Sequence, residues 1–231
     1  MRVEVAGLRA GYGSATILEE IGFSVPEHSA LAIVGRNGMG KSTLLKAVMG
    51  YLKPSRGSVS MGERNVTGWP TYRISRMGVA YAAQEKSLFG ELSIEENLTV
   101  GKGKRCSSEL RDEVFSYFPV LGKRLKQRAG TLSGGEQKML TLAKALVGSP
   151  DLLVLDEISD GLGPAVISAV GTALKSLRER HGCTILMVEQ NLDLSLDVAD
   201  TVAVLKLGSL VFEQPSGEPG LRDELVAQLA P

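Results

Sequence analysis

The sequence predicts an α/β fold with a mainly parallel central sheet. Short apolar runs alternate with segments of helical length and periodicity, which is typical of strands connected by helices. The runs contain no polar alternation, so they suit strands that are buried on both faces. They lie at residues 30–34, 78–82, 152–155, 184–188 and 201–205. Helical patterns lie between them at residues 41–50, 134–147, 164–180 and 191–198, and Pro164 suits the first turn of its helix.

Three segments differ from this alternation. Residues 3–8 and 21–25 alternate between polar and apolar side chains around a Gly- and Ser-rich turn, which predicts an N-terminal antiparallel β ribbon. Residues 208–213 look like the second half of another hairpin. Residues 91–127 contain helical patterns at 93–100 and 107–118 and no convincing strand, which indicates an inserted helical subdomain. We therefore expect a single domain over 1–231, with a core of about 1–84 and 141–231 and a helical subdomain of about 85–140.

Composition narrows the possible functions. The 231 residues carry 26 Lys and Arg against 26 Asp and Glu, and this balance gives no indication of a nucleic-acid partner. Cys106 and Cys183 are far apart and in no metal-ligand spacing, so they predict neither a disulfide framework nor a zinc site. There is no signal peptide and no run of 18 apolar residues, so a cytoplasmic protein is expected. One group of basic residues is interpreted as a solvated face: Arg105, Arg111, Lys123, Arg124, Lys126 and Arg128.

A glycine-rich loop predicts the binding of a nucleoside triphosphate, with ATP and Mg²⁺ expected. Residues 35–43 read GRNGMGKST and fit the pattern G-x-x-x-x-G-K-[ST] between a predicted strand and a predicted helix. Glycines allow backbone N–H groups to face phosphate oxygens, and the helix N-terminus adds partial positive charge. Lys41 would reach the β- and γ-phosphates, and the Ser42 hydroxyl would ligate Mg²⁺. The expected ATP-binding residues here are Gly35, Arg36, Asn37, Gly38, Met39, Gly40, Lys41, Ser42 and Thr43.

Two carboxylates follow a buried strand. Residues 152–157 read LLVLDE. In phosphoryl transfer an Asp at such a position holds Mg²⁺, usually through water, and an adjacent acid can orient the attacking water. Asp156 and Glu157 fit these two roles. Many strands end in charged residues, so the signal gains weight from the phosphate loop that precedes it.

The segment LSGGEQ at residues 132–137 completes a set of motifs. One interpretation is a capping box, with Ser133 as N-cap and Glu136 at the third helical position. Together with GRNGMGKST, Gln84 and LLVLDE, in this order and spacing, the segment makes nearly the whole chain resemble the ATP-binding subunits of ABC transporters. The resemblance implies a P-loop NTPase (RecA-like) core. It also implies hydrolysis in a dimer that holds two ATP molecules between head-to-tail subunits.

The resemblance also implies roles for individual residues. Tyr12 matches the aromatic residue that stacks on adenine, and Gln84 matches a glutamine that touches Mg²⁺ and the lytic water. Residues 85–100 match the region that contacts a membrane permease. Ser133 and Gly135 match residues that grip the γ-phosphate of ATP held by the opposite protomer. The full implied signature segment is Leu132, Ser133, Gly134, Gly135, Glu136 and Gln137.

Three positions depart from the family pattern. Ile158 replaces a usual proline, Gly163 replaces a usual aspartate, and Gln190 stands where a switch histidine is usual. Gln190 can hydrogen-bond the γ-phosphate but cannot carry a proton or a positive charge. The set GRNGMGKST, ISDGLGP and VEQN is similar to importer ATPases for branched-chain amino acids, amides and urea. Such importers often pair a histidine-bearing ATPase with a glutamine-bearing one; the alternative is that Gln190 weakens this site.

The implied partners are integral-membrane permeases, a second ATPase subunit and, indirectly, an external solute-binding protein. The resemblance places the chain peripherally on the inner face of the membrane. Two other functions stay open. A soluble ABC ATPase of DNA repair or translation usually contains long coiled coils or two cassettes, for which this chain has no room. A non-hydrolysing regulatory module is disfavoured by Glu157 and mildly favoured by Gln190.

Overall fold

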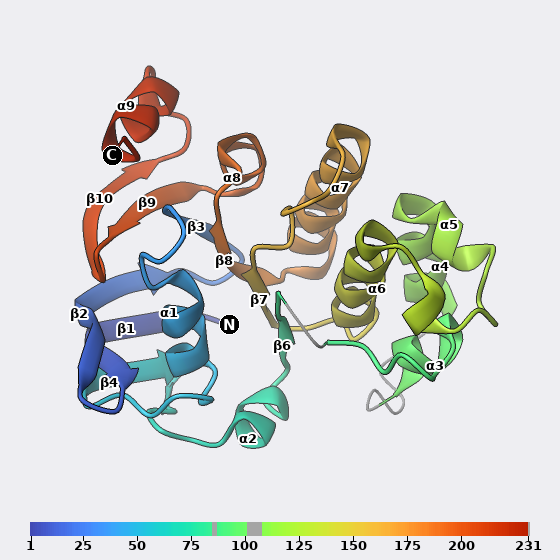
Figure 1. Ribbon diagram of the computed structural model, residues 1–231, viewed down its shortest axis with the longest axis horizontal. Coiled ribbons are helices and arrows are strands. Elements are labelled where there is room, and N and C mark those ends of the chain that lie inside the picture. Colours follow the sequence, from blue (N-terminus) through green and yellow to red (C-terminus); the bar gives the residue numbers. More distant parts are fainter. Residues whose placement is uncertain (85–86, 101–107, 231) are drawn as a thin grey trace.

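The computed structural model describes residues 1–84, 87–100 and 108–230, so Glu85, Lys86, Arg105, Cys106 and Ser107 lie outside the described residues. A six-stranded sheet with the order β10-β9-β3-β8-β7-β6 forms the centre of the molecule (Figure 1). Its strands pair in parallel except β10, which is antiparallel to β9. This arrangement confirms the predicted parallel sheet and the C-terminal hairpin. The strands are β3 (Ala30–Val34), β6 (Val79–Ala82), β7 (Leu152–Asp156), β8 (Thr184–Glu189), β9 (Thr201–Lys206) and β10 (Ser209–Pro215).

A second, antiparallel sheet contains the predicted ribbon. Strands β1 (Val3–Tyr12) and β2 (Ala15–Val25) pair over almost their full length. The ribbon is part of a larger sheet of order β2-β1-β4-β5, because β4 (Arg56–Met61) pairs with β1 and β5 (Arg64–Asn65) with β4. Strands β4 and β5 and helix α2 (Thr71–Ser75) come from residues 51–77, where the sequence pattern predicted no element.

The parallel sheet separates two hydrophobic cores. On β7, Leu153 and Leu155 face one core while Leu152 and Val154 face the other. The same alternation holds for β3, β8 and β9. Both faces of these strands are therefore apolar, which explains why their sequences show no polar alternation.

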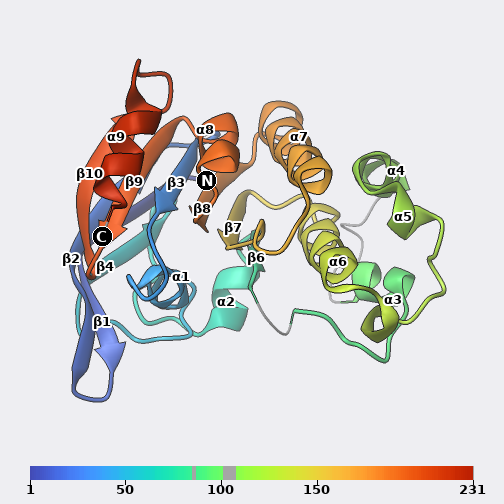
Figure 2. The same cartoon turned by 45° about the horizontal axis from the view of Figure 1, so that its top comes forward.

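Helices cover both faces of the sheet (Figure 2). Helix α1 (Lys41–Val48) packs between the two sheets, where its buried residues share one core with β1, β2 and β4. The buried residues of four other helices lie in the opposite core. They are α6 (Gly134–Leu146), α7 (Pro164–His181), α8 (Leu192–Val198) and α9 (Leu221–Gln228). Pro164 begins α7 as predicted, whereas α9 was not predicted.

The remaining helices gather at one end of the molecule, beyond α6 (Figure 1). They are α3 (Ile94–Thr99), α4 (Ser108–Tyr117), α5 (Pro119–Gly122) and the 3-10 turn η2 (Ala129–Thr131). The expected boundary near residue 140 falls inside α6, which packs on α3 and α5 as well as on β6. The division into two subdomains stays a prediction. None of the helices in the described ranges has the length and apolar character that crossing a bilayer would require.

The turn before α3 depends on one buried amide. Asn97 is fully buried, and its Nδ2 donates to the carbonyl oxygens of Phe89, Leu92 and Ser93. Its Oδ1 accepts from the Phe89 N–H at 2.9 Å. We expect Asn97→Ala to lower the free energy of unfolding by about 1–3 kcal/mol, because the Phe89 N–H loses its acceptor and three carbonyl oxygens each lose one of two donors. Urea unfolding measures this loss; Asn65→Ala, at the exposed end of β5, should cost no more than about 0.5 kcal/mol. Equal losses in both variants would contradict this account.

Candidate functional site

The carboxyl ends of four parallel strands meet at one edge of the central sheet. Strand β3 leads into the glycine-rich loop, and β6 leads towards Gln84. Strand β7 ends at Asp156, and β8 ends at Glu189 just before Gln190. Parallel strands point in the same direction, so their carboxyl ends form a common crevice in which ligands bind. Side chains far apart in the sequence are thereby brought into direct contact.

The glycine-rich loop has the backbone that its sequence predicts. Gly40 caps α1 with a left-handed φ of 102°, and a Cβ there would lie 3.0 Å from Leu18 Cδ2. A Cβ on Gly35 would lie 2.6 Å from the Leu205 carbonyl oxygen. No side chain accepts a capping hydrogen bond at the start of α1, where Ser42 and Thr43 form part of the first turn. Helix N–H groups without a side-chain cap are suited to bind anions.

Lys41 fastens this loop to the end of β7. Its Nζ donates to the carbonyl oxygens of Gly35 at 2.6 Å and Arg36 at 2.8 Å. The same atom forms an ion pair with Glu157 Oε1 at 2.9 Å. Lys41 is 4% exposed and Glu157 6% exposed, so the pair is buried. Removing one partner of such a pair leaves an uncompensated buried charge, which costs about 3–5 kcal/mol.

Asp156 is held by two hydroxyl groups. Ser42 Oγ donates to Asp156 Oδ1 and Tyr81 Oη donates to Oδ2, each at 3.0 Å. Burial raises the pKa of Asp156 above its usual range, and these two hydrogen bonds act in the opposite direction. Burial, followed by the nearby Asp156 charge, also raises the pKa of Tyr81, so its hydroxyl stays a neutral donor. Tyr81 was not predicted as a site residue, because a tyrosine on a buried strand carries no signal of its own.

Glu157 makes further hydrogen bonds through its side chain and its backbone. Gln84 Nε2 donates to Glu157 Oε2 at 3.0 Å. The backbone of Glu157 is left-handed, with φ of 47°, and its N–H donates to the Val188 carbonyl oxygen at 3.0 Å. Gln190 Nε2 donates to Asn37 Oδ1 at 2.7 Å, which places Gln190 against the glycine-rich loop. The structure therefore brings together Lys41, Ser42, Gln84, Asp156 and Glu157.

Tyr12 lies on the strand pair that packs against the loop. It ends β1, pairs with Ala15 and is 50% exposed. Ile17, two residues after Ala15 on β2, lies close to the glycine-rich loop, because a Cβ on Gly40 would be 3.3 Å from its Cγ2. The Tyr12 side chain is accessible, and its role in stacking on adenine stays a prediction.

The LSGGEQ segment opens α6 and forms the expected capping box. Ser133 Oγ accepts from the Glu136 N–H, while Glu136 Oε2 accepts from the Ser133 N–H at 2.9 Å. Ser133 and Gly134 are exposed, whereas Leu132 is buried and its carbonyl accepts from Gln137 Nε2. Further along α6, Lys138 Nζ donates to the Asp160 carbonyl oxygen and so joins this helix to the loop after Glu157.

Two of the departing residues have structural roles. Ile158 is buried in the core that α6 and α7 share. Gly163 is the N-cap of α7 and offers no side chain to the helix N–H groups, so Pro164 alone favours the start of this helix.

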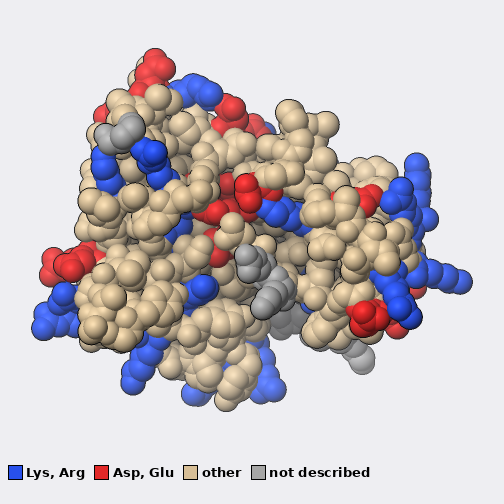
Figure 3. Space-filling view, in the orientation of Figure 1, with Lys and Arg blue, Asp and Glu red and all other residues tan. Residues whose placement is uncertain are grey.

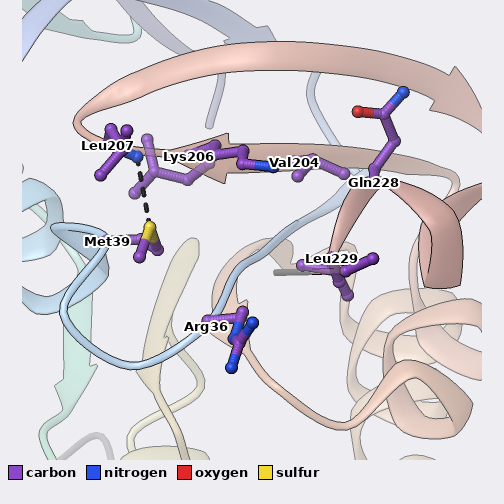
Figure 4. A pocket seen from close by; sticks show the side chains of 9 residues that line it. Arg36, Met39, Val204, Lys206, Leu207, Gln228 and Leu229 are labelled. Atoms are coloured by element: carbon purple, nitrogen blue, oxygen red, sulfur yellow. Dashed lines mark hydrogen bonds between the residues drawn. The ribbon is translucent and has the colours of Figure 1, made fainter.

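A pocket of about 140 Å³ lies between the glycine-rich loop, β9 and the end of α9 (Figure 4). The end of α9, with Gln228 and Leu229, forms one wall, and β9 with Leu207 forms another. Leu207 N–H donates to Met39 Sδ at 3.3 Å, and Gly208 N–H donates to the Met39 carbonyl oxygen at 3.2 Å. The turn after β9 thus supports the loop. Gly208, which is left-handed here, indicated a turn in the sequence, but nothing in the sequence indicated its contact with Met39.

One end of the molecule carries several basic side chains. Figure 3 shows acidic side chains near the middle of one face and basic side chains at the end that carries α4 and α5. There, Arg124 pairs with Glu136 and Arg128 with Glu91, and both arginines are exposed. These contacts agree with the interpretation of a solvated basic face.

We expect Ser133→Ala to destabilise the protein by about 1 kcal/mol, because α6 loses its N-cap. Hydrogen bonds from the Ser133 N–H and from its hydroxyl lower the pKa of Glu136, and the variant loses the second of them. The hydroxyl's contribution to stability is present at neutral pH and is lost as pH falls through the depressed pKa. The difference between wild type and variant should therefore shrink on acidification. Urea unfolding at several pH values measures both effects. A difference that does not change with pH would count against the contribution of Glu136.

Comparison with known proteins shows the family. The ABC transporter family model matches residues 18–160. The high-affinity branched-chain amino acid transport ATP-binding protein BraG of Pseudomonas aeruginosa is 36% identical, with 92% of this chain and 94% of BraG covered. A probable branched-chain amino acid transport ATP-binding protein, LivF of Archaeoglobus fulgidus, is 35% identical, with 91% of each covered. A solved structure of an ATP-binding subunit of an ABC transporter is 25% identical, with a TM-score of 0.86 over 99% of both chains. The chain therefore belongs to the ATP-binding proteins of the ABC transporter family.

Proposed function

We propose that this chain is the ATP-hydrolysing subunit of an importer for branched-chain amino acids or related small polar solutes. The observation that carries the proposal is the contact of Lys41 and Ser42 with Glu157 and Asp156 at one edge of the sheet. Phosphate-binding and carboxylate groups lie side by side there, as phosphoryl transfer to water requires. The named functions of BraG and LivF support the class of cargo.

In the proposed site, residues 35–43 hold the phosphates of ATP. The uncapped N–H groups of α1 face the anion, and Lys41 exchanges its present contacts for phosphate oxygens. The neighbouring oxygen donors suit Mg²⁺, which prefers hydroxyl, amide and carboxylate oxygens together with substrate phosphates. Ser42, Gln84 and Asp156 would hold it. Ser42 and Asp156 are in direct contact, and Gln84 contacts Glu157 through its amide nitrogen, so its amide oxygen could serve the metal ion. When bound, Mg²⁺ neutralises charge on the phosphate oxygens.

Glu157 is the proposed general base. Its Oε2 accepts from Gln84, which fixes the carboxylate where it can orient water towards the γ-phosphate and accept the proton. Triphosphate binding draws Lys41 towards the phosphates and so releases Glu157 Oε1 for this task. Gln190, already against Asn37, would donate its amide hydrogen to the γ-phosphate. It lacks the proton transfer that a histidine provides.

The site is completed by a second ATPase subunit, which forms a homodimer or a heterodimer with this chain. The exposed Ser133 and the partly exposed Gly135 would grip ATP bound to the opposite protomer. ATP would favour the closed dimer because it binds that state more tightly. Residues 85–100 would transmit closure to the permeases, and Phe89 in this range is 54% exposed. The complex would lie on the inner face of the membrane and receive solute from an external binding protein.

We expect Glu157→Gln to lower ATP turnover by about 10²–10⁴-fold, because the amide cannot accept the proton from water. Equilibrium ATP binding should be retained, and an ATP-bound dimer should accumulate. Phosphate release, nucleotide binding and size-exclusion chromatography measure the three properties. Lys41→Ala is the control, in which ATP binding itself should weaken. Unchanged turnover in Glu157→Gln would exclude Glu157 as the base. Retained ATP affinity in Lys41→Ala would count against the assignment of residues 35–43 as the phosphate-binding loop.

The alternative of a poorly hydrolysing regulatory subunit rests on Gln190. If this residue limits the rate, Gln190→His should raise hydrolysis by about tenfold or more, because histidine restores a titratable group beside the γ-phosphate. Turnover per dimer should be compared with the same substitution combined with Glu157→Gln, where no gain is expected. An unchanged rate in Gln190→His would mean that a partner's site carries the rate.

A further inference from the structure

A buried carboxylate, that of Glu189, contacts the segment that follows Glu157. Glu189 is the last residue of β8 and is 1% exposed. Its Oε1 accepts from the Ser159 N–H at 3.1 Å, and its Oε2 accepts from Ser159 Oγ at 2.6 Å and from the Gln190 N–H at 3.3 Å. Two backbone N–H groups and one hydroxyl therefore meet this carboxylate. Burying an anion is costly unless donors surround it in this way.

The residue that Glu189 holds is two positions beyond Glu157. Glu157 itself is fixed by its N–H bond to the carbonyl oxygen of Val188. Two consecutive residues of β8 thus hold the chain at Glu157 and at Ser159. Between these anchors Glu157 keeps its left-handed backbone. Non-glycine residues keep such a conformation where the surrounding contacts determine it, and these positions are common at active sites.

We propose that Glu189 is a positioning residue that acts through Glu157. By holding Ser159, it keeps the backbone of Glu157 left-handed and so directs the carboxylate towards Lys41 and Gln84. Without this anchor the loop is free to relax to a negative φ, and the carboxylate moves away from the γ-phosphate. The inference rests on the proposed function, in which Glu157 is the general base.

The test is a pair of double-mutant cycles. Glu189→Gln places an amide where two donors now meet one carboxylate oxygen, and Ser159→Ala removes one hydroxyl with little risk to folding. Both should lower kcat by about 10- to 100-fold, since a displacement near 1 Å at a reacting group has effects of this size. KM for ATP and equilibrium ATP binding should stay within about twofold, because the phosphate loop is untouched. Ser159→Thr keeps the hydroxyl and should retain most of the activity.

The second arm repeats these substitutions in a Glu157→Gln background. If Glu189 acts through Glu157, residual hydrolysis should change by no more than about twofold, because effects of residues that act as a unit are not additive. A merely structural residue would lower the residual rate by the same factor as in the wild type, and that result overturns the proposal. A third background, Gln190→Ala, separates the neighbouring residue. An effect that disappears there but persists with Glu157→Gln would assign the action to Gln190 and also overturn the proposal.

Glu113→Gln provides a matched control. The Glu113 carboxylate accepts from Ser176 Oγ at 3.0 Å, Tyr117 Oη at 3.1 Å and His181 Nε2 at 3.0 Å, and so joins α4 to α7 away from the site. Its replacement should lower Tm and leave kcat within about twofold. An equal loss of kcat in this variant would overturn the specific role of Glu189. Absent turnover in the wild type, with ATP binding retained, would overturn the proposed function and this inference together.

Discussion

The buried ion pair between Lys41 and Glu157 joins two segments that are not neighbours in the sheet. Lys41 follows β3 and Glu157 follows β7, while β8 runs between these strands. The pair therefore forms only if both strands keep their register with β8, where Val34 pairs with Glu189 and Asp156 with Val188. A slip of one residue would turn alternate side chains to the opposite face and separate the charges. The polar site and the apolar packing of three strands thus depend on each other.

Through this ion pair, Glu157 serves as the anionic partner of Lys41 before a triphosphate binds. In the proposed mechanism the triphosphate replaces Glu157 as that partner, so one carboxylate is freed in the step that brings the γ-phosphate. The exchange keeps the buried Lys41 cation compensated, while the released Glu157 carboxylate keeps its hydrogen bond from Gln84. The hydroxyl groups of Ser42 and Tyr81 donate hydrogen bonds that stabilise the buried Asp156 carboxylate. Binding and the positioning of the base are therefore linked by one set of contacts.

Local patterns in the sequence predicted the parts of the fold that depend on local chemistry. The buried strands, the glycine loop and the capping box of Ser133 all follow from neighbouring residues. Strand β4 was not predicted, because its short pattern buries few residues and pairing with distant β1 fixes it. Tyr81 and Glu189 were not predicted either, since their partners lie 75 and 30 residues away. Such contacts become visible only when the sheet order is known.

The two cores restrict the side chains of strand β3 in different ways. Ala30 and Ala32 face the core shared with α8, whereas Leu31 and Ile33 face the core shared with α1. A larger side chain at Ala32 would have to displace packed neighbours, while a similar exchange of aliphatic residues at Ile33 preserves volume. Selection therefore acts unequally on adjacent codons. Over evolutionary time the alanine positions should stay small while the leucine and isoleucine positions drift among branched aliphatic residues, which gives one short strand two substitution rates.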